Sequence, residues 1–179
     1  MTTAYFGLGS SLGDRLAMLR AAVRTLLEHP KLRIDLARDV ASLYETTPVG
    51  GPPGQSLYLN SALRLKTSLS PADLLAAALS IEASLGRTRR TRWEPRTIDL
   101  DLLLVGDCIV DSPTLTLPHP RLHVRRFVLE PLSELAADLI HPVTGVPIGA
   151  LTQRLRRAPE ADVVTRIEGP EWVSGSPAG

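Results

Sequence analysis

Two aspartates lie two residues apart in Trp93–Gly106, WEPRTIDLDLLLVG, a stretch that otherwise has the composition of a β-strand. Alternation places Asp99, Asp101 and Leu103 on one face, with the aspartate backbones roughly 7 Å apart. The opposite face is apolar and expected to be buried, and it comprises Ile98, Leu100, Leu102 and Leu104. Because Asp is a poor strand residue, the pair indicates a function, although taken alone it also fits a solvent-facing strand.

An arginine-rich segment comes directly before this strand. Five of the ten residues in RTRRTRWEPR, 87–96, are arginine. Alone, such a segment fits a solvated loop or a nucleic-acid patch. Guanidinium groups also bind phosphate oxygens, and paired carboxylates suit Mg²⁺ that is shared with substrate phosphates. Together the two features predict a site for a metal-bound polyphosphate, where positioning and charge stabilisation supply most of the catalysis.

Two further segments carry polar and aromatic side chains in loop-like contexts. TLPHPRLHVRRFVLEPL contains His119, Arg125 and Phe127, and YETTPVGGPPGQSLYLN contains Tyr58 and Asn60. Aromatic faces can enclose a flat heterocycle, and an amide can recognise its polar edge. For each residue singly, core packing or a structural turn remains an equally good interpretation.

Apolar periodicity and helix-capping residues predict the order of elements. Strands are predicted over 4–10, 33–46 and 58–66 and through the aspartate stretch, and helices over 13–29 and 70–86. Asp14 and Ser70 stand at the two helix starts. The order β-α-β-β-α-β predicts an α+β, ferredoxin-like core with a mainly antiparallel sheet. Helical additions are predicted within 129–140 and 148–158.

Composition limits the class of protein. The chain has 179 residues, 44% of them hydrophobic and 4% aromatic, with a net charge of +1 and one cysteine, Cys108. We expect one domain over 1–167 with a flexible tail over 168–179, and a monomer without nucleic-acid or membrane partners. A cysteine-based zinc site is excluded. With no export-signal pattern at the N-terminus, the expected location is the cytoplasm.

Four motifs together resemble one known family. They are GLGSSLGDR, YETTPVGGPPGQSLYLN, IEASLGRTRRTRWEPRTIDLDLLLVG and LTLPHPRLHVRRFVLEPL, in the family's order between about Ala4 and Gly145. On these motifs the chain resembles the 6-hydroxymethyl-7,8-dihydropterin pyrophosphokinases of folate biosynthesis. The resemblance implies that the pterin hydroxymethyl oxygen attacks the β-phosphorus of ATP and that AMP leaves. It also implies two Mg²⁺ ions as cofactors and ATP as co-substrate.

The resemblance implies roles for individual positions. Asp99 and Asp101 match the metal-binding aspartates, and the catalytic set adds Arg87, Arg89 and Arg96. The pterin-binding set comprises Thr46, Val49, Tyr58, Asn60, Trp93 and Phe127. The ATP-binding set comprises Glu82, Arg87, Arg89, Trp93, Arg96, Leu102, Thr116, His119 and Arg125.

The chain departs from the family pattern at Glu94, where glycine is usual, and the position equivalent to Arg89 could instead be Arg90. Two alternatives therefore stay open at this point. One is a nucleic-acid-binding ferredoxin-like module, which leaves the two aspartates unexplained. The other is a catalytically impaired homologue that binds pterin or nucleotide without turnover.

Overall fold

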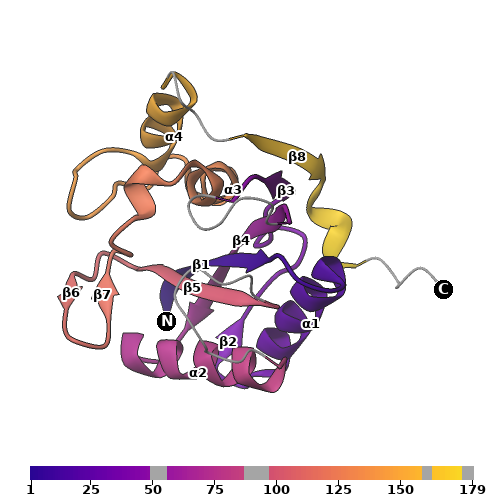
Figure 1. Ribbon diagram of the computed structural model, residues 1–179. Coiled ribbons are helices and arrows are strands. Elements are labelled where there is room, and N and C mark those ends of the chain that lie inside the picture. Colours follow the sequence, from indigo (N-terminus) through magenta and orange to yellow (C-terminus); the bar gives the residue numbers. More distant parts are fainter. Residues whose placement is uncertain (49–55, 87–96, 159–162, 175–179) are drawn as a thin grey trace.

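A mainly antiparallel sheet forms the centre of the molecule (Figure 1). The computed structural model describes residues 1–48, 56–86, 97–158 and 163–174. Within this part of the chain the main sheet has the order β5-β1-β4-β3-β8, β2 also pairs with β4, and every pairing is antiparallel. Its strands are β1 (Thr2–Ser10), β2 (Leu32–Arg33), β3 (Leu43–Thr46), β4 (Tyr58–Thr67), β5 (Asp99–Val105) and β8 (Val164–Glu168). A separate ribbon pairs β6 (Val110–Asp111) with β7 (Thr116–Leu117).

Helices cover both faces of this sheet, α1 and α2 on one side and α3 on the other, and α4 packs against α3 (Figure 1). Their bounds are α1 (Arg15–Glu28), α2 (Pro71–Ser84), α3 (Arg126–Ala136) and α4 (Ile148–Arg156), with 3-10 turns η1 (Leu122–Val124) and η2 (Pro170–Val173). Two apolar clusters fill the interfaces, one for each face. The predicted α+β, ferredoxin-like fold with C-terminal helices is therefore confirmed. No helix of the described part is long and apolar enough to cross a membrane.

The first two helices begin where the capping residues predicted. The Oδ1 atom of Asp14 accepts the Ala17 N–H at 2.9 Å, and the Oγ atom of Ser70 accepts the Asp73 N–H at 3.2 Å. These bonds satisfy backbone donors that a helix start leaves without partners. Gly86 follows α2 with φ +83°, a conformation that favours glycine at a helix end.

The strand predicted over 33–46 is interrupted. β2 ends at Arg33 and β3 starts at Leu43, with a turn between them. Asp39 Oδ2 accepts the Asp35 N–H at 2.8 Å, and Asp35 Oδ1 accepts the Ala37 N–H at 3.1 Å. Short acidic side chains that bond the local backbone compete with strand pairing, which explains the interruption.

A bulge in β5 changes the predicted alternation. Tyr5 pairs with Leu104 and Phe6 with Leu102, so Leu103 is the extra residue. Leu103 and Leu104 consequently both pack in the cluster beneath α3. The prediction that Leu104 shares a face with Leu102 is wrong for this reason.

Residues 168–174, which are expected from the sequence to belong to a flexible tail, pack against the core in the structure. Glu168 ends β8, and Trp172 in η2 is 0% exposed within the main core. Its Nε1–H donates to the Ala41 carbonyl at 2.9 Å. The buried indole holds this segment against the core, whereas 175–179 lie outside the described residues.

Candidate active site

The two aspartates lie on one face of the edge strand β5, as their spacing predicted. Both side chains are half-buried, and their Cα partners on β1 are Gly9 for Asp99 and Gly7 for Asp101. A Cβ added to Gly9 would lie 3.7 Å from the Asp99 Cβ, and one added to Gly7 would lie 3.8 Å from the Asp101 Cβ. The glycines therefore share the aspartate face. The Leu103 side chain, with Cδ2 3.5 Å from a Cβ built on Gly7, packs over Gly7, so the backbone floor beside the carboxylates is centred on Gly9. The motif GLGSSLGDR contains both glycines without assigning them a role. Their alternation within a predicted strand is the signal that they share one face.

A polar edge borders this floor on the side away from Asp99. Asn60 is the Cα partner of Gly9 on β4, and its Nδ2 atom donates to Thr46 Oγ1 at 2.7 Å. Asn60 is 6% exposed and Thr46 is 2% exposed. The Asn60 Oδ1 atom lies 3.2 Å from a Cβ built on Gly9, so this acceptor faces the floor. Two interstrand spacings, roughly 10 Å, separate the backbones of Asp99 and Asn60.

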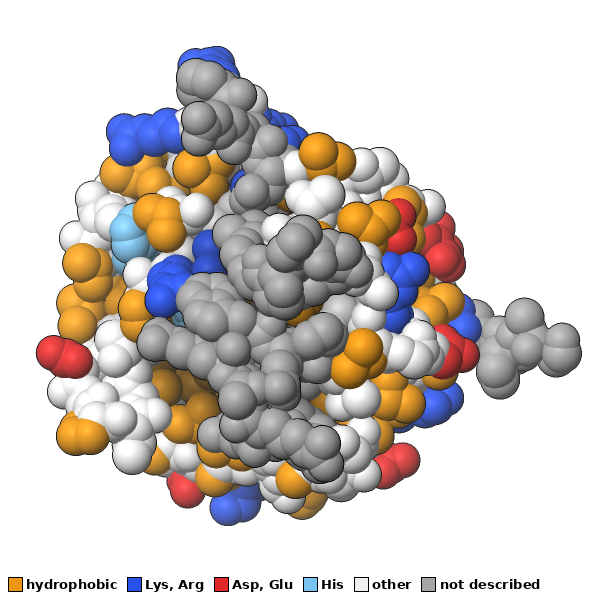
Figure 2. All heavy atoms as spheres, viewed as in Figure 1, with side chains coloured by type: hydrophobic (Ala, Val, Ile, Leu, Met, Phe, Trp, Pro, Cys, Tyr) orange, Lys and Arg blue, Asp and Glu red, His pale blue; other side chains and the backbone are white. Residues whose placement is uncertain are grey.

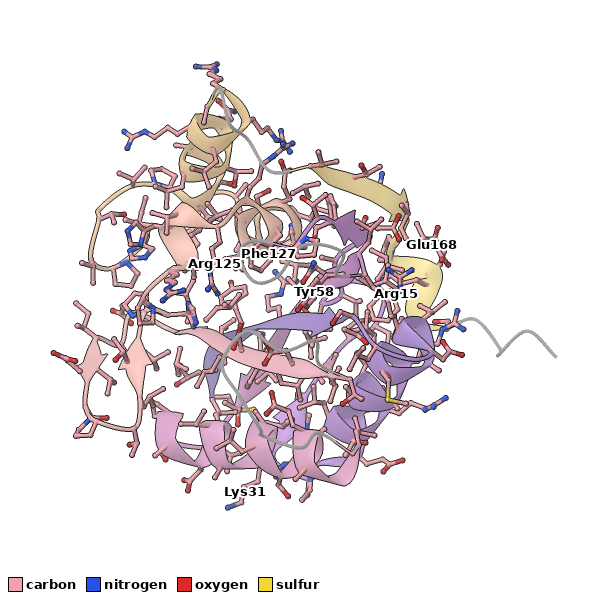
Figure 3. The ribbon with its side chains drawn as sticks, viewed as in Figure 1. Arg15, Lys31, Tyr58, Arg125, Phe127 and Glu168 are labelled. Atoms are coloured by element: carbon pink, nitrogen blue, oxygen red, sulfur yellow. The ribbon has the colours of Figure 1, made fainter. Side chains whose placement is uncertain are left out.

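Aromatic residues flank the same face (Figure 3). Tyr58, the Cα partner of Thr46, is half-buried at the start of β4. Phe127 lies in the first turn of α3, half-buried against the cluster that includes Ala62 and Leu103. The structure thus brings the predicted pterin residues Thr46, Tyr58, Asn60 and Phe127 to one side of the sheet.

Positive charge gathers at the start of α3. Arg125 is the N-cap residue, its guanidinium carbon lies 5.5 Å from the Phe127 ring centroid, and the first turn contains no acidic side chain. Arg126 is bonded to Glu130 at 2.8 Å. Because the helix N-terminus is itself positive, a cation placed there favours an anion nearby. Figure 2 shows basic side chains beside the grey residues in the middle of this face and over α4.

His119 lies close to both the acidic and the basic groups. The backbone N–H of His119 donates to the Leu103 carbonyl at 2.9 Å, which places this residue beside β5. Desolvation, together with the positive charges of Arg125 and Arg121, lowers the pKa of His119 to about 4, although the negative charge of Asp99 opposes the shift. The ring is therefore neutral at pH 7. Since Nδ1 accepts the Arg121 N–H at 3.3 Å, the ring hydrogen lies on Nε2, which can donate to a ligand.

Two predicted nucleotide contacts are buried rather than open. Glu82 on α2 is 2% exposed, and its Oε1 atom accepts the Leu100 N–H at 2.7 Å, between the two aspartates. This carboxylate therefore satisfies an outward-facing donor of the edge strand. The Leu102 side chain is 5% exposed in the core on the α1 and α2 side, so only its main chain could meet a nucleotide. Thr116 lies half-buried on β7.

Several predicted site residues lie outside the described residues. They are Val49, Arg87, Arg89, Trp93 and Arg96, together with Arg90 and Glu94.

The acidic side of the site matches the chemistry of Mg²⁺. Within the described ranges no three His, Cys, Asp or Glu side chains cluster as a complete metal site. Mg²⁺ commonly binds through one or two carboxylates and completes its coordination with water and substrate phosphates. The two carboxylates on one face of β5 therefore fit this ion. A site formed by protein ligands alone would need more donors than these two side chains supply.

Comparison with known proteins identifies the family. The family model for 7,8-dihydro-6-hydroxymethylpterin-pyrophosphokinase (HPPK) matches residues 5–137. The chain belongs to this family. Residues 138–174, which include α4, β8 and η2, lie beyond the matched region.

Two curated relatives carry the same name, 2-amino-4-hydroxy-6-hydroxymethyldihydropteridine pyrophosphokinase. The Bacillus subtilis protein is 47% identical over 136 residues, which are 76% of this chain and 79% of the relative. The Methylorubrum extorquens protein is 46% identical over 140 residues, 78% of this chain and 86% of the relative.

A solved structure supports the fold. A triple mutant of the Plasmodium falciparum HPPK-DHPS protein superposes on this chain with a TM-score of 0.69 at 14% identity. The match covers 89% of this chain and 44% of that one, so this chain spans less than half of the Plasmodium protein.

Proposed function

We propose that this protein transfers pyrophosphate from ATP to the hydroxymethyl group of 6-hydroxymethyl-7,8-dihydropterin, a step of folate biosynthesis. Membership of the HPPK family and the names of its relatives support this activity. The observation that carries the proposal is the glycine floor. It joins an acidic side, Asp99 and Asp101, to a hydrogen-bonding side, Asn60 and Thr46, on a single sheet face.

The reaction exchanges one phosphorus–oxygen bond for another. The hydroxymethyl oxygen of the pterin attacks the β-phosphorus of ATP, and the bond from that phosphorus to the oxygen bridging the α-phosphate breaks. AMP leaves with the bridging oxygen, and the proton of the attacking hydroxyl is released to solvent. Such a transfer needs both substrates held in line, because most of the catalysis comes from positioning and charge stabilisation.

The carboxylates would hold Mg²⁺, and we propose two ions between Asp99, Asp101 and the phosphates. Mg²⁺ neutralises phosphate charge and stabilises the attacking and leaving oxygens. The neutral His119 ring would donate a hydrogen bond to a phosphate oxygen from Nε2, and Arg125 would supply charge from the start of α3. Arg87, Arg89 and Arg96 are proposed to add further phosphate contacts.

The pterin would lie over Gly9 with its polar edge toward Asn60. The amide presents Oδ1 to the floor, and the Thr46 hydroxyl, which accepts from Asn60, keeps its own hydrogen for donation. Tyr58 and Phe127 would enclose the ring system from the two sides. Val49 and Trp93 complete the proposed pterin set, and Glu82, Leu102 and Thr116 complete the ATP set.

We also propose that the protein acts as a monomer in the cytoplasm, without nucleic-acid or membrane partners. A nucleic-acid-binding module is the less favoured alternative, because Asp99 and Asp101 would repel a phosphate backbone in the absence of metal. Size-exclusion chromatography would test the monomer.

The decisive experiment follows the nucleotide product. The protein is mixed with ATP, Mg²⁺ and 6-hydroxymethyl-7,8-dihydropterin, and AMP and ADP are separated by chromatography. We expect AMP only when the pterin is present, and none with 6-methyl-7,8-dihydropterin, which lacks the attacking hydroxyl. ADP formation would indicate transfer of the γ-phosphate and contradict the proposal. Binding of both substrates without AMP would indicate the catalytically impaired homologue.

A further inference from the structure

One arginine contacts both the end of strand β3 and the residue before strand β4. Arg15, the first residue of α1, donates from Nη1 to Glu45 Oε1 at 3.2 Å and to the Leu57 carbonyl at 2.7 Å. Glu45 directly precedes Thr46, and Leu57 directly precedes Tyr58. Thr46 and Tyr58 are themselves Cα partners across β3 and β4. A single guanidinium group therefore joins the two strands beside their proposed pterin-facing residues.

The geometry of arginine suits this bridge. The Nη1 atom carries two hydrogens, so it can serve both acceptors at once. Arg15 and Glu45 side chains are 30% and 32% exposed, which partly shields their interaction from water. The anchor is also fixed, because Asp14 caps α1 and the Arg15 N–H donates to the Gly13 carbonyl at 3.0 Å.

Packing adds little to this connection. The bridge lies at an open pocket of about 320 Å³ lined by Ser11, Leu12, Gly13, Arg15, Glu45, Ser56 and Leu57. Leu12 and Leu57 are each 40% exposed. Since the strand ends border a pocket rather than a filled core, the two hydrogen bonds of Arg15 reinforce the pairing of β3 with β4 at this point.

We propose that Arg15 is a positioning residue for the pterin, and this inference rests on the proposed function. By holding Glu45 and Leu57, it reinforces the strand pairing that places Thr46 beside Tyr58 and Asn60, and thereby the shape of the pterin edge. Arg125, which is proposed for ATP, lies on the other side of Tyr58 from Arg15 (Figure 3). Arg15 therefore affects pterin affinity and leaves ATP affinity unchanged.

The test measures the Kd of the pterin, by its fluorescence, together with KM for each substrate. Arg15→Met keeps the length of the side chain and removes the hydrogen bonds. We expect the pterin Kd and KM to rise about tenfold, as the loss of one charge-assisted hydrogen bond predicts, with the KM of ATP within twofold of wild type. Arg15→Lys retains one donor group and should recover part of the affinity.

Arg20 offers a matched control on the same helix. Its Nε–H donates to the Trp172 carbonyl at 2.7 Å, another partly buried bond to a distant segment. Arg20→Met should lower the melting temperature without changing the pterin Kd. If both variants weaken pterin binding equally, Arg15 acts through general stability and the inference is overturned. An unchanged pterin Kd in Arg15→Met overturns it as well.

Glu45→Gln and the Arg15→Met/Glu45→Gln double variant test the bridge itself. We expect non-additive effects on the pterin Kd, because both changes act on the same ion pair: Glu45→Gln removes its negative charge and Arg15→Met its positive charge. Additive effects would show that Arg15 does not act through Glu45. If the wild-type protein binds pterin but forms no AMP, the proposed function is contradicted. The pterin Kd values of the wild type and of the Arg15 and Arg20 variants then still decide whether Arg15 positions the pterin.

Discussion

We predict that Gly9→Ala weakens pterin binding strongly while changing the stability of the protein little. Gly9 lies at the centre of the floor, between Asp99 on β5 and Asn60 on β4. The added methyl group would lie 3.2 Å from Asn60 Oδ1 and 3.7 Å from the Asp99 Cβ. The first contact is tighter than ordinary van der Waals contact, so the amide must move by a few tenths of an ångström.

The expected magnitudes follow from these contacts. Alanine gains about 0.5–1 kcal/mol over glycine within a strand, and straining the bond from Asn60 to Thr46 costs about 1 kcal/mol, so the net change in unfolding free energy is near zero. In the complex, the displaced amide would leave a pterin hydrogen bond unmade, which costs about 1–3 kcal/mol. The pterin Kd should therefore rise roughly tenfold to a hundredfold.

The assay pairs urea unfolding with fluorescence titration of the pterin. Gly149→Ala is a suitable control, since a Cβ there would lie 3.2 Å from the Ala137 carbonyl oxygen, an equally tight contact on α4. We expect that control to keep the wild-type pterin Kd. A Gly9→Ala variant that binds pterin as the wild type does would refute the idea that the pterin lies on this floor.

Three further predictions concern metal, protonation and the C-terminus. Asp99→Asn and Asp101→Asn should each lower kcat at least about a hundredfold with an unchanged melting temperature, and isothermal titration should show weakened binding of Mg²⁺–ATP. Because the folded pKa of His119, about 4, lies below the ordinary value of 6.5, its contribution to stability is present above pH 6.5 and is lost as the pH falls toward 4. His119→Gln should flatten that part of a plot of melting temperature against pH, and an unchanged slope would contradict the shift. Trp172→Ala should destabilise the protein by about 3–5 kcal/mol in urea unfolding, since the indole is 0% exposed, whereas a loss below 1 kcal/mol would show that the segment is dispensable for the core.

Local features of the chain could be predicted from the sequence because their causes are local. Asp14 and Ser70 cap helices through bonds to residues three positions away. The shared face of Asp99 and Asp101 follows from alternation over three residues. The order of elements was sufficient for the ferredoxin-like core, since short connections restrict how consecutive elements can pair.

Features that depend on distant partners could not be predicted in the same way. The bulge at Leu103 arises from its pairing with β1, which the composition of β5 does not reveal. The pairing of β8 with β3 joins Thr165 to Glu45, residues far apart in the chain. The family motif assigns the Glu82 carboxylate to nucleotide binding. Its hydrogen bond to the Leu100 N–H depends on how α2 packs against the edge strand β5, which the sequence does not reveal.

The central position of β1 explains how the site keeps its dimensions. β1 pairs with β5 on one side and with β4 on the other, so its glycines set the separation of Asp99 from Asn60 at two interstrand spacings. That distance is a property of the hydrogen-bonded sheet and does not depend on the connecting segments. Side chains there could fill the space between the carboxylates and the amide, which explains why this strand carries Gly7 and Gly9 despite the low strand propensity of glycine. A substitution at Gly9 should therefore act on the substrates, whereas a substitution at Gly7 would meet the Leu103 side chain first and one at Arg15 would act on the strand ends.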